Sequence, residues 1–155
     1  MYTKINEKDS AMKLGAIYSK EKTTFTLFSP VADSVFVIFY DKGNDSAEKG
    51  RLEMMRGEGE LRSIFSATAE GNLDGVYYTY EVHTSDGTFS SHDPYARACG
   101  VNGHRSMVID LSKTDPDGFA DEDRPKLADP MSMVITEVSV ADVSAGASAH
   151  SRYPG

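Results

Sequence analysis

The segment 74–91, DGVYYTYEVHTSDGTFSS, limits the fold more narrowly than any other part of the chain. A run rich in tyrosine and valine leads into Ser85-Asp86-Gly87, and a short polar run follows. This pattern is typical of a β-hairpin, because Asp-Gly readily adopts the backbone angles of a tight turn. Alternation along the first strand separates Val76, Tyr78, Tyr80 and Val82 from Tyr77, Thr79, Glu81 and His83. We therefore expect Tyr78 and Tyr80 to lie in a hydrophobic core.

Further short runs have the length and composition of β-strands. They cover residues 15–19, 23–30, 34–40, 51–57, 61–71 and 106–111. The run SVFVIFY (34–40) is continuously apolar, which predicts a central strand covered on both faces. Residues 51–57 and 61–71 predict a second hairpin around the turn GEGE. Because no helical periodicity of useful length is present, the expected fold is all-β: an antiparallel immunoglobulin-like β-sandwich over residues 14–111.

The composition changes on both sides of the expected sandwich. Residues 1–13 are polar and are expected to form a flexible N-terminus. Residues 112–132 are polar and acidic and contain three prolines, which predicts a linker. MVITEVSV (133–140) is one more candidate strand, and residues 145–155 are expected to be a disordered tail. The sandwich therefore carries a polar C-terminal extension.

Charge and composition exclude several classes of function. The formal net charge is −8 and no face of clustered Lys and Arg is evident, which argues against binding of nucleic acid. The single cysteine excludes an internal disulfide. No apolar stretch approaches the length of a membrane span, and the first residues contain no apolar run long enough to suggest a signal peptide. We expect a cytoplasmic protein without membrane contact, or a piece cut from a longer one.

No constellation of residues supports a catalytic mechanism within this chain. The four histidines, His83, His92, His104 and His150, lack the paired spacing of metal ligands, so neither a metal nor a cofactor is expected. Glu58 and Glu60 lie on a predicted turn, where solvated carboxyl groups are poor general acids at neutral pH. The chain is therefore expected not to be an enzyme.

Phe89 is an aromatic residue in polar surroundings just after the hairpin turn. An exposed aromatic ring offers a flat apolar face on which a sugar ring can stack. The alternative is an edge residue that packs against a neighbouring segment. The sequence leaves both interpretations open.

The most distinctive stretch is DPYARACGVNGHRSMVIDL (93–111). Together with residues 14–41 and 74–82, it resembles the N-terminal region of bacterial type I pullulanases, members of glycoside hydrolase family 13 that cleave α-1,6 branch points. The resemblance covers about residues 14–144 and implies a β-sandwich of carbohydrate-binding-module family 48. In that family the stretch leads toward the catalytic (β/α)8 barrel. The resemblance therefore implies a barrel-docking segment, with Asp93, Pro94, Tyr95, Asn102 and Arg105 as candidates.

The resemblance also implies where a sugar would bind. Glycogen-binding members of this family use two Trp and a Lys, whereas this chain has no Trp. Phe89 falls near the second aromatic position and Thr79 near the Lys, while the loop 41–50 offers no aromatic residue for the first. The candidate carbohydrate-binding residues are Phe89, Thr79 and Tyr77. Affinity for α-glucan by this route is expected to be weak or absent.

Residues 136–144 lie where the family has its first barrel strand. Glu137, Val140 and Asp142 match the family pattern, whereas Thr136, Ser139, Ala141 and Val143 do not. Residues 133–144 are accordingly expected to be a remnant of that strand, and the family's catalytic residues lie beyond it.

Two hypotheses follow from these observations. The first is a non-catalytic N-terminal module of a pullulanase-like debranching enzyme, which docks on the catalytic barrel and binds α-glucan weakly at most. The alternative is a free-standing glycan-binding or protein-interaction β-sandwich. Without a barrel, the docking surface and an unpaired strand 133–140 would be exposed, which predicts a homodimer through that strand or through residues 93–105.

Overall fold

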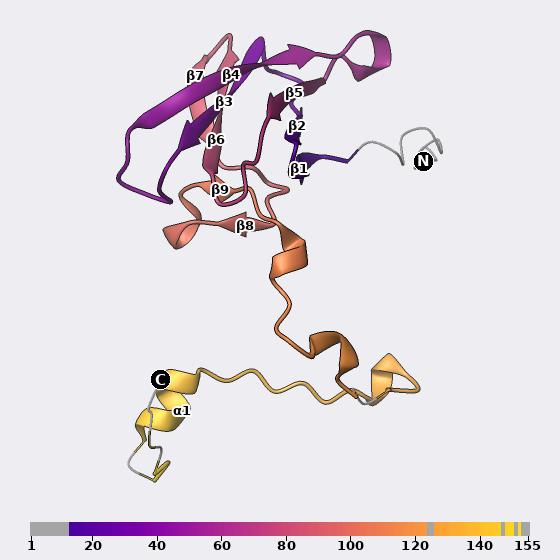
Figure 1. Ribbon diagram of the computed structural model, residues 1–155, viewed down its shortest axis with the longest axis vertical. Coiled ribbons are helices and arrows are strands. Elements are labelled where there is room, and N and C mark those ends of the chain that lie inside the picture. Colours follow the sequence, from indigo (N-terminus) through magenta and orange to yellow (C-terminus); the bar gives the residue numbers. More distant parts are fainter. Residues whose placement is uncertain (1–12, 124–125, 147, 151, 153–155) are drawn as a thin grey trace. The chain divides into compact units, whose positions relative to one another are not determined.

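A computed structural model describes residues 13–123, 126–146, 148–150 and 152 (Figure 1). The chain divides into two compact units, Met1–Asp115 and Pro116–Gly155. The first unit holds the strands, all of which pair in antiparallel fashion. The expected all-β sandwich is therefore confirmed. The expectations for residues 1–12 and for positions 147, 151 and 153–155 of the tail lie outside the described residues.

The strands form two layers that share one strand. The first layer has the order β1 (Gly15–Tyr18), β2 (Lys22–Phe28), β5 (Ile64–Glu70). The second has the order β4 (Glu48–Arg56), β3 (Ser34–Tyr40), β6 (Tyr77–Thr84), and β7 (Gly87–Ser91) and β9 (Ser106–Met107) both pair with β6. The short β8 (Ala98–Cys99) pairs with β9. β4 joins the layers, because Met55 and Arg56 at its end pair with β5.

The core lies between these layers and is rich in aromatic rings. Phe25 and Phe65 of the first layer pack against Tyr78 and Tyr80 of the second, and all four are almost fully buried. The ring centroids of Phe25 and Tyr78 lie 5.0 Å apart in an edge-to-face arrangement. Each large side chain buried in this way contributes roughly 1.5–3 kcal/mol. The prediction that Tyr78 and Tyr80 belong to the core is confirmed.

Both predicted hairpins are present. β6 and β7 meet at the turn before Gly87, whose φ of 137° is one that glycine adopts readily. β4 and β5 are joined through a short 3-10 turn at Gly59–Leu61. β3 lies between β4 and β6, as its apolar run predicted. Val35 and Val37 point to the core, and Ile38 is buried on the opposite face of the strand. We call that opposite side of the second layer its outer face.

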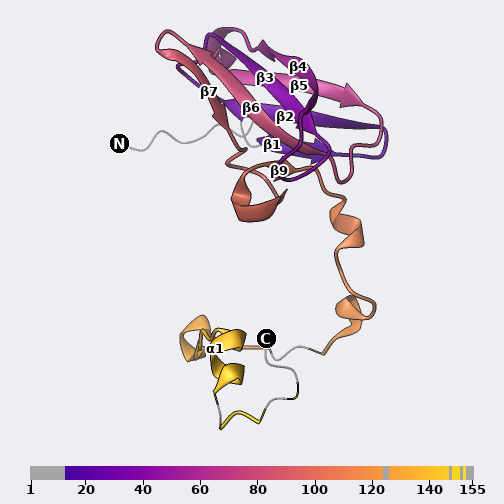
Figure 2. The ribbon, with the colours of Figure 1, turned by 90° about the vertical axis from the view of Figure 1, so that its left-hand side faces the viewer.

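The last predicted strand, 106–111, is shorter than expected. β9 ends at Met107, and a 3-10 turn follows at Leu111–Lys113. The Asp110 side chain caps this turn by accepting a hydrogen bond from the Ser112 N–H, which turns the chain out of the sheet. β9 lies at one end of the sandwich in both views (Figure 1, Figure 2).

The predicted strand over 133–140 is wrong. Residues 133–139 have no regular structure, and a short helix, α1 (Val140–Ala145), follows. Ser139 caps this helix by accepting a hydrogen bond from the Asp142 N–H, a local arrangement that favours a helix start. Among the described residues no strand pairs with this segment, and a strand without a partner leaves its backbone N–H and C=O groups unsatisfied. No helix in the described part of the chain has the length and apolarity needed to cross a bilayer.

Candidate functional site

A polar pocket opens on the outer face where β3 ends, with a volume of about 460 Å³. Three parts of the chain line it. The strands contribute Tyr40, Thr79 and Ser90, the loop after β3 contributes Asn44 and Asp45, and the segment before β9 contributes Val101, Asn102, His104 and Arg105. We call this the polar pocket.

Tyr40 and Thr79 form one wall of the polar pocket. They lie on neighbouring strands, and the Tyr40 hydroxyl lies 3.3 Å from the Thr79 hydroxyl. The Arg105 guanidinium lies over the Tyr40 ring, 3.5 Å from the ring centroid. This stacking covers one face of the ring with a positive charge. Thr79 is 5% exposed, so that little of its surface is open to solvent.

The loop that carries Asn44 and Asp45 approaches the segment before β9 very closely. A Cβ atom added to Gly100 would lie 2.5 Å from the Gly43 Cα atom, and one added to Gly43 would lie 2.8 Å from the Gly100 Cα atom. Only glycine permits such an approach of two backbones. Asp45 and Asn102, one on each side, have positive φ angles of 46° and 53°, which Asp and Asn tolerate better than most residues.

The side chains of the polar pocket suit a ligand rich in hydroxyl groups. Amide, carboxylate, imidazole and hydroxyl groups offer both donors and acceptors. The volume falls in the range of roughly 300–1,000 Å³ that is common for small-molecule sites, but the lining is more polar than in most of them. No group of His, Cys, Asp and Glu in the described part of the chain could hold a metal ion.

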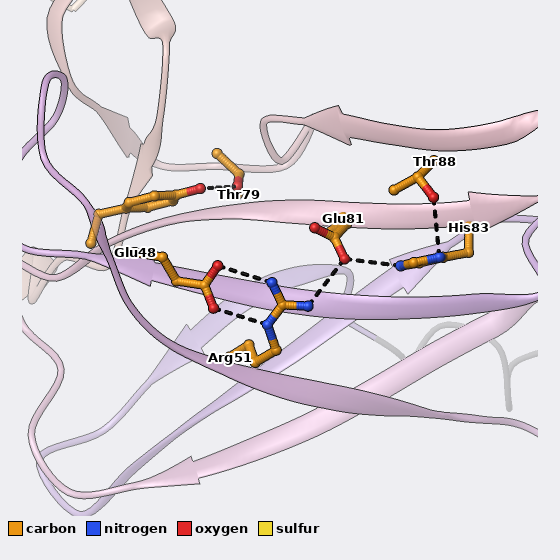
Figure 3. Close-up of polar contacts among 7 residues, drawn as sticks. Glu48, Arg51, Thr79, Glu81, His83 and Thr88 are labelled. Carbon is orange, nitrogen blue, oxygen red and sulfur yellow. Dashed lines mark hydrogen bonds and ion pairs between the residues drawn. The ribbon is translucent and has the colours of Figure 1, made fainter.

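A row of charged side chains lies on the same outer face, across β4, β6 and β7 (Figure 3). Arg51 donates two hydrogen bonds of 2.9 Å to Glu48 and one of 3.3 Å to Glu81. His83 lies 2.9 Å from Glu81, and its other ring nitrogen lies 3.2 Å from the Thr88 hydroxyl. The hydrogen bonds from Arg51 lower the pKa of the Glu48 carboxyl. Because these side chains already form hydrogen bonds with one another, they have fewer free donors and acceptors for a ligand than the polar pocket has.

The structure divides the predicted carbohydrate-binding residues between two faces. Phe89 is 53% exposed, and its direct partner across the hairpin is Val82. Directly paired residues share a face, which places Phe89 on the side of Val82 and Tyr80, opposite to Thr79. Tyr77 is half-buried on the outer face, where its ring lies under Gly43 in the loop. Thr79 lines the polar pocket, whereas Phe89 does not.

The buried position of Asp93 does not fit the prediction that it belongs to a docking segment. It is 2% exposed and accepts hydrogen bonds from the hydroxyls of Tyr78 and Tyr80 and from the Tyr95 N–H. Its own N–H donates to the buried Ser106 hydroxyl. A carboxylate held inside the sandwich by three donors serves the fold, because the hydrogen bonds offset the cost of burying its charge.

The other predicted docking residues point in different directions. Pro94 and Tyr95 are exposed, and the Tyr95 side chain begins next to Gly15 of β1. Asn102 and Arg105 both line the polar pocket, and Arg105 stacks on the Tyr40 ring. Only Pro94 and Tyr95 therefore remain on a surface facing away from the polar pocket.

A second hollow lies beside β1, with a volume of about 310 Å³. It is lined by β1 and by residues 107–112, with Ile17 and Leu111 among them. Ile17, Leu111 and the nearby Tyr95 are 40%, 51% and 47% exposed. We call these three residues the β1-side apolar surface.

Sequence reasoning missed most of the polar pocket. The sequence pattern places Tyr40 only at the end of an apolar strand, and Asn44 and Asp45 only in a loop, 41–50, that offers no aromatic residue. Alternation already placed Tyr40 on the face opposite to Val35 and Val37, and this signal could have identified it. Nothing local could have joined Asn44 to Asn102, because 58 residues separate them in the chain.

Comparisons with known proteins show the family to which the chain belongs. Residues 13–96 match the family Carbohydrate-binding module 48 (Isoamylase N-terminal domain). Pullulanase A of Streptococcus pneumoniae serotype 4 is 31% identical over 116 residues, which cover 70% of this chain and 9% of that protein. The chain thus spans about a tenth of this relative.

Solved structures show the same relationship. The pullulanase of Bacillus acidopullulyticus superposes with a TM-score of 0.76 at 35% identity, over 87% of this chain and 16% of that chain. A pullulanase of Paenibacillus barengoltzii, in complex with maltohexaose and α-cyclodextrin, superposes with a TM-score of 0.77 at 34% identity, over 87% of this chain and 20% of that chain. The matched family is a carbohydrate-binding module and not a catalytic domain. The chain belongs to the carbohydrate-binding module 48 family, and over most of its length it is similar to parts of pullulanases.

Proposed function

We propose that this module binds α-glucan weakly in the polar pocket and packs against the catalytic barrel of a pullulanase-type debranching enzyme. The observation that carries the first part is the pocket itself. It is about 460 Å³ in volume, and Asn44, Asp45, Asn102 and His104 converge on it from two segments. The similar Paenibacillus barengoltzii structure is a complex with maltohexaose and α-cyclodextrin, which supports an α-glucan as the ligand class.

The chemistry of the pocket favours a sugar over an apolar ligand. Each glucose hydroxyl both donates and accepts a hydrogen bond, and the amides of Asn44 and Asn102 can do the same. An apolar ligand would leave these groups without partners, which costs free energy. Because Arg105 covers one face of Tyr40, stacking of sugar on that face is reduced.

A titration with maltoheptaose and with a branched α-glucan, read by NMR shift changes, tests the first part. We expect shifts at residues 43–46 and 101–105, and weaker binding in Asn44→Ala and Asn102→Ala. Phe89→Ala is the matched control, because Phe89 lies on the opposite face of the sheet. Loss of binding in Phe89→Ala alone would move the site to the hairpin edge and contradict the proposal.

The β1-side apolar surface supports the docking part. Ile17, Tyr95 and Leu111 are exposed next to a hollow of about 310 Å³, and exposed apolar surface of this kind marks contact sites. The test is association with the separately produced catalytic barrel of a related pullulanase, measured by calorimetry. Tyr95→Asp should weaken association, whereas Phe89→Asp should not. Glucan binding without any association would favour the alternative of a free-standing glycan-binding module.

A further inference from the structure

Arg105 is bound to the loop after β3 through several contacts. One guanidinium nitrogen, Nη1, donates to the Lys42 carbonyl and to the Ser46 hydroxyl, both at 2.8 Å. The other, Nη2, donates to the Ser46 carbonyl at 2.9 Å. The Cζ atom of the same group lies 3.5 Å from the centroid of the Tyr40 ring. One side chain therefore joins the β9 end of the sandwich to both ends of the loop 42–46.

The loop 42–46 carries pocket residues and otherwise lies on the surface. Asn44 and Asp45 are exposed and line the polar pocket, and Asp45 has a positive φ of 46°. Lys42 and Ser46, which bracket them, are the residues that Arg105 holds. The position of Asn44 and Asp45 over the pocket thus depends on where Arg105 holds the loop.

We propose that Arg105 is the positioning residue of the glucan site, which presents Asn44 and Asp45 to the sugar by clamping the loop 42–46 against Tyr40. The inference rests on the proposed binding of α-glucan in the polar pocket. It assigns Arg105 a role inside the module, where the resemblance had placed it on a docking surface.

The chemistry of the clamp requires arginine. A guanidinium is planar and directs donors from two nitrogens in a fixed fork, so that it can bond two carbonyls and a hydroxyl while it stacks on a ring. A lysine ammonium is a point charge on a flexible stem and cannot stack in this way. Arg105→Lys should therefore keep the positive charge at the pocket, but the loop 42–46 should no longer be held in place.

The experiment compares wild type, Arg105→Lys and Asn44→Ala with the double variant, all titrated with maltoheptaose. We expect Arg105→Lys to weaken binding by about tenfold, the usual scale for losing one or two charge-assisted hydrogen bonds. Since Arg105 acts through the loop, its effect should shrink when Asn44 is already truncated. Arg62→Lys, an exposed arginine after the 3-10 turn of the β4–β5 connection, is the control and should leave binding unchanged.

A second readout separates positioning from general loss of stability. Backbone ¹⁵N relaxation should show faster motion at residues 43–46 in Arg105→Lys, with Val37 and Tyr80 of the core unchanged. If Arg105→Lys binds maltoheptaose as tightly as wild type, or if its loop 43–46 stays rigid, Arg105 does not position the loop. Weaker binding in Asn44→Ala would still support the glucan site in that case. Absence of wild-type binding would overturn the glucan site and, with it, the assignment of Arg105. If the losses of binding free energy in Arg105→Lys and Asn44→Ala simply add in the double variant, Arg105 does not act through Asn44.

Discussion

The Tyr78 hydroxyl donates a hydrogen bond of 2.7 Å to the Asp93 carboxylate, and Tyr80 donates a second, of 3.2 Å, to the same oxygen. The two tyrosines belong to the core strand β6, whereas Asp93 opens the segment that was predicted to dock. The second carboxylate oxygen accepts the Tyr95 N–H at 2.8 Å. Asp93 therefore fixes the exposed residues Pro94 and Tyr95 to the centre of the sandwich.

Asp93→Asn should destabilise the fold. All three partners of the carboxylate are donors, and an amide replaces one acceptor oxygen by a donating NH₂ group. The loss of hydrogen bonds to a buried charged group should lower the free energy of unfolding by about 1.5–3 kcal/mol in urea titrations. Asp86→Asn, the same change in the exposed hairpin turn, is the control. Equal stability of the two variants would contradict the role of Asp93.

The buried tyrosines predict a loss of stability at alkaline pH. Burial, followed by the nearby Asp93 charge, raises the pKa of both Tyr78 and Tyr80. Their contribution is fully present below the ordinary tyrosine pKa of about 10 and is lost as pH rises through the higher folded value. With two protons retained by the folded state, the free energy of unfolding should fall by up to about 2.7 kcal/mol per pH unit above pH 10.

Unfolding by urea at a series of pH values from about 9 to 11 measures this slope. Tyr80→Phe should reduce it by about half, because one ionisable phenol is removed from both states. The same slope in wild type and in Tyr80→Phe would show that Tyr80 does not contribute.

Asp74 predicts a loss of stability in acid. The Lys113 ammonium donates to Asp74 at 2.7 Å and the Asp110 N–H donates at 2.8 Å, and these bonds lower the pKa of the Asp74 carboxyl. A carboxylate with a lowered folded pKa stabilises the fold above its ordinary pKa, and this stability is lost as pH falls through the folded value. Asp74→Asn should therefore be less stable than wild type at pH 7, and the difference should shrink in acid.

Thermal unfolding at neutral and acid pH tests the Asp74 prediction. Asp41→Asn is the control, since Asp41 and its partner Lys49 are both more than half exposed and exposed pairs contribute little. If the difference in unfolding temperature between wild type and Asp74→Asn stays the same down to the lowest pH, the ion pair is not its cause.

Gly100→Ala should displace the loop after β3. The added Cβ would lie 2.5 Å from the Gly43 Cα atom, so one of the two backbones has to move. Overpacking of this kind costs about 1–3 kcal/mol of stability, and it should weaken maltoheptaose binding as well. Gly50→Ala in β4 is the matched control, because no atom lies within 4 Å of its added Cβ. Wild-type stability of Gly100→Ala would contradict the close approach.

The predicted homodimer now rests on residues 93–105, because no strand forms at 133–140. We expect sedimentation at high concentration to show a dimer, driven by exposed side chains such as Tyr95 and Val101, which are 47% and 55% exposed. Tyr95→Asp should restore the monomer. A monomer in wild type at every concentration would disprove the dimer.

The sequence by itself determined the strands, the two hairpins and the core tyrosines. These features depend on alternation with a period of two and on turn residues such as Asp86-Gly87, which are local properties. The same local reasoning failed at 133–140, since an apolar run forms a strand only where another strand pairs with it, and here Ser139 starts a helix instead.

The tertiary structure alone decided the candidate site. Tyr40, Asn44 and Asn102 meet only because β3 and the segment before β9 end on the same side of the sandwich. Two further facts depend on that packing: the buried position of Asp93 and the stacking of Arg105 on Tyr40. Contacts between residues 58 or more positions apart carry no local signal, because hydrophobic periodicity reports the face of a strand and not its neighbours.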